Sequence, residues 1–150
     1  MFGDFQCPFC LRAQSVIEHV RAGLGDRLVF GFRHLPIPER HPLSPIAAQA
    51  SEAAAAQGRF WEYYDALFAA QPRLSRETML EVGRDLGLDA ERMAAEIDVE
   101  AYGERIERDI ASAAASGATG TPTFFVNGIR HFGPYDAPAL TAELEGTATA

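Results

Sequence analysis

Two cysteines separated by two residues, Cys7 and Cys10, stand almost at the start of this chain of 150 residues. Pro8 lies between them, and a proline in the first turn of a helix costs no backbone hydrogen bond. The motif is therefore predicted to follow the tail of a strand at residues 1–5 and to open a helix. Apolar residues continue behind it at helical spacing until two glycines end the pattern, at Ala13, Ile17, Val20, Gly23 and Gly25. A dithiol at a strand-to-helix junction limits the folds that this chain can adopt.

The middle of the chain is predicted to be helical. Residues 28–35 are rich in strand formers and stop at Pro36, so they are expected to form a second strand before a proline-rich link. Ser44, Ser75 and Asp89 are the residues expected to cap helices. The expected helices span residues 45–56, 60–70, 75–87, 89–97 and 101–115.

The end of the chain is predicted to form a hairpin and a helix. Asn127-Gly128 between apolar runs indicates a type I′ turn joining strands at 123–126 and 129–132. A helix is expected at about 136–145, followed by a frayed tail at 146–150.

The composition excludes several classes of protein. The chain has 13 basic residues, all arginine, and 21 acidic ones, with a net charge of −8, so no basic face is available for nucleic acid. No run of apolar residues is long enough for a membrane span. With no export signal before the motif, a cytoplasmic location is expected if Met1 is the true start, and an extracytoplasmic one if an upstream signal or anchor is missing.

The two thiols are better suited to chemistry than to stabilisation. A disulfide closing so short a loop contributes only about 2 kcal/mol in the chain-entropy model. The helix N-terminus offers Cys7 free N–H groups and a partial positive charge, which favour the thiolate. Cys10 lies one turn further, on the apolar face, where a thiol stays protonated. We therefore expect Cys7 to attack and Cys10 to resolve the mixed disulfide.

Two other interpretations of the pair are open from the residues alone. The thiols could be half of a zinc site, but no second Cys-x-x-Cys or His-x-x-x-His motif completes it. They could also be inert buried thiols, which the proline at the helix entrance disfavours. The candidate histidine ligands are His19, His34, His41 and His131.

The arrangement resembles the thioredoxin superfamily, specifically its DsbA-like thiol-disulfide oxidoreductases. The resemblance rests on residues 3–10 and 120–128, with residues 57–62 resembling the entry to the family's insertion helix. It implies an α/β, thioredoxin-like fold, in which helices flank a central mixed sheet and an all-helical insertion interrupts the core. One domain would cover residues 1–150, with the core at about 1–42 and 117–150 and the insertion at about 43–116.

The resemblance also implies site residues. Pro122 would follow a cis bond and face Cys7, and the backbone of Thr121 would pair with an extended substrate segment. Pro8 and Phe9 are further substrate-binding candidates, because the middle of the motif must be exposed for attack. The family commonly has a glutamate six residues before the first cysteine, where this chain has Met1, and upstream sequence could carry an export signal or a membrane-transporter fusion.

The leading hypothesis is an enzyme that exchanges disulfides with protein thiols through Cys7 and Cys10, using no metal and no organic cofactor. Its partners would be protein thiol or disulfide substrates and a redox partner that recycles the site. The alternative is a non-catalytic peptide-binding or regulatory module, as part of a longer membrane-associated protein. A glutathione-dependent transferase or isomerase is a third option, although such enzymes need no resolving thiol. The direction of electron flow is not encoded in these motifs.

Three further features are interpreted as structural, and one as a minor electrostatic influence on the site. Asp4 is expected to fix the turn before Cys7 or to cap the helix, and His34 to end a strand beside the motif. Arg12 is close enough to favour the Cys7 thiolate slightly. The aromatic run that begins at Phe60 is expected to be mostly core.

Overall fold

The computed structural model describes residues 1–147. The chain begins with strand β1 (Phe2–Gly3), helix α1 (Pro8–Leu24), a short 3₁₀ turn (Gly25–Arg27) and strand β2 (Arg33–His34). After the helices described next, it ends with β3 (Phe125–Val126), β4 (Ile129–Arg130) and α7 (Ala137–Thr147). None of the helices within this part of the chain is long and apolar enough to cross a membrane.

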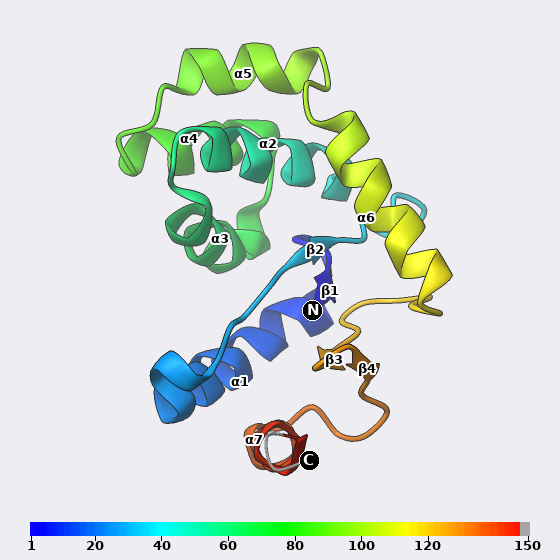
Figure 1. Cartoon of the computed structure of the whole chain (residues 1–150). Helices are drawn as coiled ribbons and strands as arrows, with labels where there is room; N and C mark the ends of the chain where they lie inside the picture. Colours follow the sequence, from blue (N-terminus) through cyan, green and yellow to red (C-terminus); the bar gives the residue numbers. More distant parts are fainter. Residues whose placement is uncertain (148–150) are drawn as a thin grey trace.

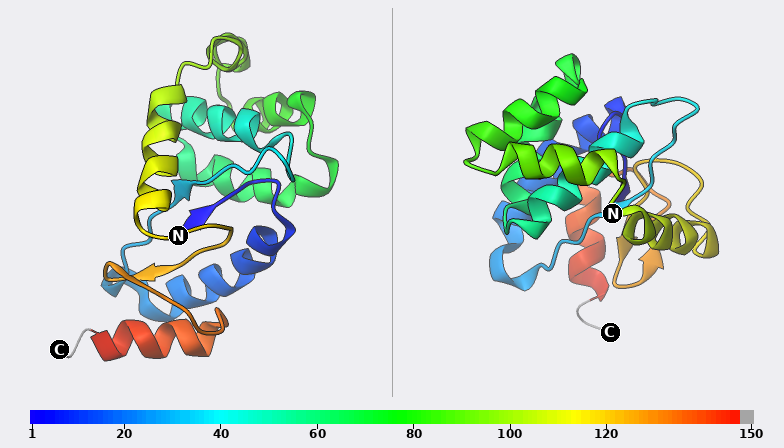
Figure 2. Two further views of the ribbon diagram at one scale, coloured as in Figure 1. Left: turned by 90° about the vertical axis from the view of Figure 1, so that its right-hand side faces the viewer. Right: turned by 90° about the horizontal axis from the view of Figure 1, so that it is seen from above.

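A helical segment separates β2 from β3 along the chain and lies on one side of the strands (Figure 1). Its parts are α2 (Ser44–Ala56), α3 (Phe60–Ala69), a 3₁₀ turn (Gln71–Arg73), α4 (Arg76–Asp85), α5 (Ala90–Asp98) and α6 (Gly103–Ala115). Together these parts are called the α2–α6 segment. On the other side of the strands, α1 packs against α7 (Figure 2).

The predicted helix caps are correct in two cases of three. The side chains of Ser75 and Asp89 accept hydrogen bonds from the amides three residues further on, as N-caps do. The prediction for Ser44 is wrong, because Ser44 lies inside α2. Its hydroxyl donates instead to the carbonyl of His41 at 2.8 Å, so it stabilises the turn that leads into the helix.

The strands form one small mixed arrangement around β1. β1 pairs in parallel with β2, and an antiparallel bridge joins Phe2 to Thr123, just before β3. β3 and β4 are the antiparallel hairpin, with positive φ angles at Asn127 and Gly128 as a type I′ turn requires. The strands thus form two two-stranded sheets, β1–β2 and β3–β4, and the bridge at Thr123 links the second sheet to β1.

The strands are shorter than the sequence suggests. The run predicted at 28–35 is a strand only at β2, and the hairpin strands predicted at 123–126 and 129–132 contract to β3 and β4. Residues 28–32 carry strand-forming side chains but no strand lies beside them to provide a ladder. At the C-terminus, α7 extends through residue 147, so only residues 148–150 of the expected tail remain, and these lie outside the described part of the chain.

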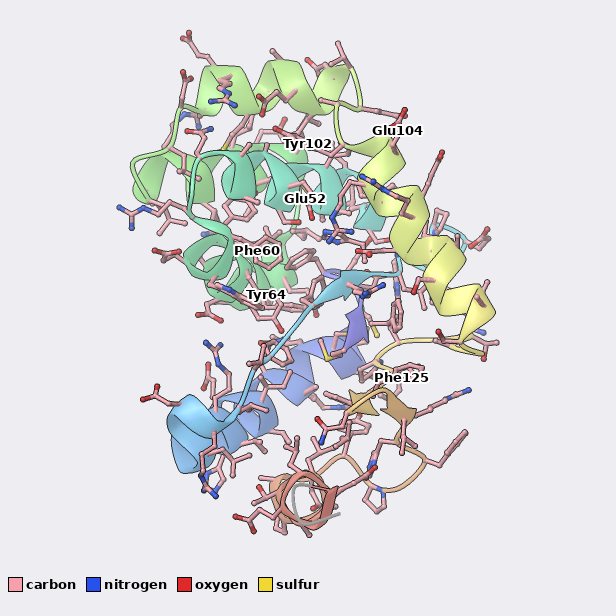
Figure 3. The ribbon with its side chains drawn as sticks, viewed as in Figure 1. Glu52, Phe60, Tyr64, Tyr102, Glu104 and Phe125 are labelled. Atoms are coloured by element: carbon pink, nitrogen blue, oxygen red, sulfur yellow. The ribbon has the colours of Figure 1, made fainter. Side chains whose placement is uncertain are left out.

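An aromatic core joins the strands to the α2–α6 segment. The ring of Phe5 lies 4.8 Å from that of Phe68, and the ring of Tyr64 lies 5.1 Å from that of Phe32. Figure 3 shows Tyr64 and Phe60 on the side of α3 that faces the chain leading to β2. The buried part of this aromatic run is core, as expected, at Tyr63, Tyr64, Leu67 and Phe68. Each such side chain contributes about 1.5–3 kcal/mol when it is removed from water.

A polar network ties β2 to two helices of the α2–α6 segment. The ring Nε2 of His34 lies 2.8 Å from a carboxylate oxygen of Glu52 in α2, and its backbone amide donates to Asp109 in α6 at 2.9 Å. Arg105 pairs with Asp109 at 2.7 Å. Because His34 is buried, its partners set the end of β2, which is the structural role expected for this residue.

Candidate active site

The loop before α1 is held by the buried carboxylate of Asp4. One oxygen accepts a hydrogen bond from the backbone amide of Gln6 at 2.8 Å, so Asp4 fixes the turn. The other accepts from the amide of Ile37 at 3.0 Å and lies 2.9 Å from Nδ1 of His41. Asp4 does not cap α1, whose N-cap residue is Cys7. The turn that presents the first cysteine is therefore anchored to the proline-rich link.

Cys7 stands at the N-terminus of α1, as predicted. Pro8 occupies the first turn, and Cys10 lies on the buried face of the helix with Ala13 and Ile17. The two cysteines are not joined in a disulfide, and both are buried. Phe9 is 50% exposed, so the middle of the motif is where the surface opens beside the dithiol.

The environment separates the two thiols in acidity. A hydrogen bond from the Cys10 thiol is the largest cause that lowers the pKa of Cys7, to about 5, against the opposing effect of burial. The side chain of Thr121 and the backbone amides of Phe9 and Cys10 add to the lowering. The pKa of Cys10 is raised, first by its hydrogen bond to Cys7 and then by burial. This asymmetry makes Cys7 the thiolate and Cys10 the protonated partner at neutral pH.

The Thr121–Pro122 peptide bond is cis and lies against Cys7. The carbonyl oxygen of Thr121 is 3.5 Å from Sγ of Cys7, across 114 positions of sequence. Thr123, the next residue, exchanges two backbone hydrogen bonds with Phe2. Pairing with β1 therefore fixes the loop that carries Thr121 and Pro122 opposite the first cysteine.

Arg12 lies against Phe9, the residue in the middle of the motif. Its guanidinium is 4.4 Å from the centre of the Phe9 ring, a cation–π distance. The groups with the largest effects on the pKa of Cys7 do not include Arg12, so the slight effect expected of it stays a prediction.

Gln71 is a contact residue that the sequence patterns did not identify. It is the first residue of the 3₁₀ turn after α3, and its side-chain amide donates to the carbonyls of Phe5 at 2.7 Å and Cys7 at 3.0 Å. A glutamine before a proline carries no recognisable motif. Only the tertiary structure brings it to the dithiol.

The histidines considered as zinc ligands are spread over the molecule. His34 lies beside Glu52, His41 beside Asp4, and His131 beside Glu143. Among residues 1–147, no group of three or more histidine, cysteine or acidic side chains is arranged to hold a metal ion.

The sheet, the dithiol at the helix N-terminus and the cis proline opposite it define a thioredoxin-like protein. The family model of the DSBA-like thioredoxin domain matches residues 42–145, and the chain belongs to this family. The matched range covers the α2–α6 segment and the hairpin, and it begins after the dithiol.

Solved structures agree with this assignment. A thioredoxin-like oxidoreductase from Silicibacter pomeroyi is 27% identical, with a TM-score of 0.84 over 99% of this chain and 84% of that chain. BdbD from Bacillus subtilis is 21% identical and matches 99% of this chain and 85% of that chain with a TM-score of 0.88, which shows a common fold.

The chain is also similar to part of much longer proteins that are named as Na⁺/H⁺ antiporters. A Na⁺/H⁺ antiporter NhaA from Herminiimonas arsenicoxydans is 51% identical over 144 residues, covering 96% of this chain and 23% of the relative. An NhaA antiporter from Mycolicibacterium vanbaalenii is 44% identical over 146 residues, covering 96% of this chain and 24% of the relative. The chain therefore spans about a quarter of the length of these relatives.

Proposed function

We propose that this chain exchanges disulfides with protein thiols through Cys7 and Cys10. The observation that carries the proposal is the position of Cys7 at the helix N-terminus, where the Cys10 thiol, the Thr121 side chain and the first backbone amides of the helix lower its pKa. Thiolate nucleophiles in such electropositive surroundings are typical of disulfide oxidoreductases, whereas inert thiols are buried without them.

In the reducing direction, the Cys7 thiolate attacks one sulfur of a substrate disulfide. A mixed disulfide forms, the substrate S–S bond breaks, and the released substrate thiolate takes a proton. Cys10 then loses its proton and attacks Sγ of Cys7, which releases the second substrate thiol and leaves a Cys7–Cys10 disulfide. The oxidising direction is the reverse sequence, in which a substrate dithiol gives up two electrons and two protons.

Substrate binding is assigned to the surface beside the dithiol. Because Cys7 is 2% exposed, a substrate sulfur has to approach between Phe9 and the Thr121–Pro122 loop. An extended substrate would pair with the backbone of Thr121, while Pro8, Phe9 and Pro122 contact its side chains. No metal or organic cofactor takes part in the proposed exchange. A redox partner protein recycles the dithiol.

Two cysteine variants test this function. In Cys10→Ala, the mixed disulfide cannot be resolved, so covalent adducts with a protein substrate accumulate and are visible on a non-reducing gel. In Cys7→Ala, exchange is abolished. Normal turnover of a disulfide substrate by Cys7→Ala would contradict the proposal.

The alternative is a module that binds extended peptides without turnover. It predicts a Cys7 thiol with the free pKa of about 8.5. The hydrogen bonds that lower the pKa of Cys7 to about 5 favour the enzyme instead. Measured exchange activity separates the two.

The antiporter name is not transferred to this chain. It belongs to proteins of which this chain covers 23 or 24%. The proposal for this chain rests on its own dithiol, and attachment to a longer membrane-associated protein is compatible with it.

A further inference from the structure

The segments around the dithiol lack acidic residues, although the chain as a whole is acidic. The chain has 21 acidic residues and a net charge of −8. None of these acidic residues falls in the four stretches of sequence that meet at the dithiol, which are residues 5–17, 40–51, 66–76 and 110–135. The first stretch contains the dithiol, and hydrogen bonds join the other three to it, between Leu43 and Gln6, Gln71 and Cys7, and Thr121 and Cys7.

Asp4, three residues before Cys7, is the acidic residue nearest to the dithiol in the sequence. Its side chain is fully buried and lies 2.9 Å from Nδ1 of His41, so its charge is shielded from the surface. Glu39, in the proline-rich link, is exposed, but Arg40 follows it directly and carries the opposite charge. Little uncompensated negative charge therefore reaches the surface beside Cys7.

Arg12 is the charged side chain beside the exposed part of the motif. Its guanidinium lies 4.4 Å from the centre of the Phe9 ring, which is 50% exposed. Residues three and four positions away are the neighbours of a side chain on a helix, and for Arg12 none of these is acidic: they are Pro8, Phe9, Ser15 and Val16. No ion pair within residues 1–147 includes Arg12. The positive charge beside Phe9 is therefore available to a substrate.

The arginines of the third stretch, in contrast, already have acidic partners. Arg73 follows Gln71 by two residues, and its guanidinium lies 3.2 Å from the carboxylate of Glu81. Arg76 pairs with Asp98 at 2.6 Å. Arg12 is thus the arginine near the dithiol that is best placed to pair with an incoming carboxylate.

We propose that Arg12 selects substrates that carry an acidic side chain close to the reacting cysteine. The selection rests on the proposed function, since it acts on the same exchange at Cys7. The substrate sulfur approaches between Phe9 and the Thr121–Pro122 loop, and Arg12 lies on the Phe9 side of this approach. A planar guanidinium can stack on an aromatic ring while the N–H groups at its edge donate to a carboxylate. Arg12 is therefore a specificity residue and takes no part in the transfer of electrons.

Disulfide exchange with three peptides tests this selection. Each peptide has a single cysteine that is joined through a disulfide to a thiopyridyl group. The peptides differ only in the residues two positions before and after the cysteine, which are both Glu, both Gln or both Lys. The Cys7 thiolate of the reduced full chain attacks the peptide sulfur, so that a Cys7–peptide disulfide forms. The thiopyridyl sulfur leaves with the electron pair of the broken bond and takes up a proton, and the absorbance of the released thiopyridone gives the rate constant.

The Glu peptide is expected to react about threefold faster than the Gln peptide, and the Lys peptide about threefold more slowly, as a weak exposed ion pair allows. Each rate constant is divided by that of β-mercaptoethanol with the same peptide, which removes the intrinsic reactivity of the peptide. The net charge of −8 alone predicts the opposite order, with the Lys peptide fastest. Screening at about 0.5 M salt should reduce the preference, because the pair is exposed.

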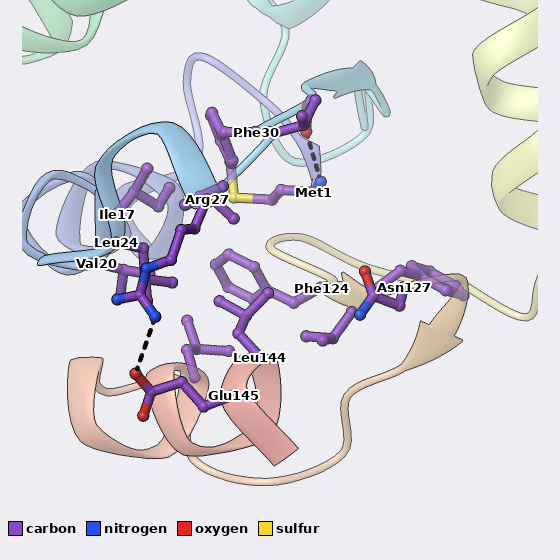
Figure 4. A pocket seen from close by; sticks show the side chains of 16 residues that line it. Met1, Ile17, Val20, Leu24, Arg27, Phe30, Phe124, Asn127, Leu144 and Glu145 are labelled. Atoms are coloured by element: carbon purple, nitrogen blue, oxygen red, sulfur yellow. Dashed lines mark hydrogen bonds and ion pairs between the residues drawn. The ribbon is translucent and has the colours of Figure 1, made fainter. Parts of the chain in front are cut away.

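Three variants separate the charge of Arg12 from its other effects. Arg12→Gln should abolish the preference for Glu, whereas Arg12→Lys, which keeps the charge, should retain it. Arg27→Gln is the matched control, because Arg27 lies beyond the other end of α1, roughly 20 Å from Arg12 along the helix. Its partner there is Glu145, at 3.7 Å (Figure 4). This control should show the same preference as the unsubstituted protein.

Equal rate constants for the three peptides, or faster reaction of the Lys peptide, would overturn the proposal and leave the exchange reaction intact. A preference for Glu that persists in Arg12→Gln would overturn it as well. Failure of the proposed function gives a different result, in which the unsubstituted protein releases thiopyridone from every peptide no faster than Cys7→Ala does. That result would overturn the exchange reaction and the selection together.

Discussion

The side-chain amide of Gln71 donates a hydrogen bond to the backbone carbonyl of Cys7 at 3.0 Å, across 64 positions of sequence. The same nitrogen donates to the carbonyl of Phe5 at 2.7 Å, so both of its protons are used. The α2–α6 segment thereby holds the loop that carries the first cysteine. Gln71 positions the dithiol and takes no part in the exchange itself.

Replacing Gln71 with alanine is expected to destabilise the protein by about 1–3 kcal/mol, because two carbonyls lose their donor in a partly buried place. Urea unfolding measures this loss. The alkylation rate of Cys7 should also change, because its loop is released. Gln57→Ala is the matched control: Gln57 bonds the backbone of Asp89 at an exposed site, so that variant should leave Cys7 reactivity unchanged. Identical reactivity in both variants would refute the positioning role.

Asp4→Asn is expected to lower the free energy of unfolding by about 1–3 kcal/mol. The carboxylate accepts from the amides of Gln6 and Ile37 and pairs with His41, and an asparagine NH₂ cannot replace an acceptor oxygen. The exposed Asp136→Asn is the control, since asparagine caps a helix as well as aspartate does. Urea unfolding that ranks both variants as equally stable would show that the buried carboxylate is dispensable.

Local patterns were sufficient to predict the dithiol, most helices and the hairpin turn. Each of these features depends on only a few neighbouring residues. Pro8 starts a helix, Ser75 caps one, and Asn127-Gly128 forms a turn. Ser44 shows the limit of such patterns. It has the side chain of a cap, but its hydroxyl bonds the preceding turn instead.

Contacts between distant segments were not predictable. Gln71 reaches Cys7, His41 reaches Asp4, and Glu52 reaches His34, over separations of 64, 37 and 18 residues. Nothing in the residues near each partner indicates such a pair. The strand expected at 28–35 is present only at Arg33–His34, because the length of a strand depends on a neighbouring strand as well as on β propensity.

Alkylation of Cys7 by iodoacetamide is expected to rise with pH through about 5 and then to level off. A free thiol would keep gaining reactivity up to about pH 8.5. In Cys10→Ala, Cys7 loses its main hydrogen-bond donor, so the pH at which its alkylation rate is half-maximal should move upward. If the alkylation rate of Cys7 in the unsubstituted protein were half-maximal only above pH 8, the environment described for Cys7 would be contradicted.

The same shift predicts how the stability of the reduced protein depends on pH. The pKa of Cys7 is about 5 when folded, against about 8.5 for a free thiol, so this group stabilises the reduced protein most above about pH 8.5. Its contribution declines as the pH falls and is lost once the pH passes through about 5. The reduced Cys7→Ala variant should lack this part of the pH dependence in urea unfolding.

Phe9→Ala is expected to make the Cys7–Cys10 couple less oxidising. Removing a half-exposed ring admits water to the end of α1, which weakens the backbone stabilisation of the thiolate and raises the pKa of Cys7. Because a stable thiolate favours the reduced form, the potential should fall by about 30 mV for each unit by which that pKa rises. Equilibration with glutathione buffers measures the potential.

The control for this variant is Phe132→Ala. Phe132 is exposed and lies under an arginine, Arg130, as Phe9 lies under Arg12, but it follows β4 and is not part of the dithiol motif. Its removal should therefore leave the potential and the pKa of Cys7 unchanged. If both variants shift the potential equally, the effect comes from losing an exposed aromatic ring in general. A shift confined to Phe9→Ala, in proportion to the pKa of Cys7, would instead link the residue between the cysteines to the redox balance of the site.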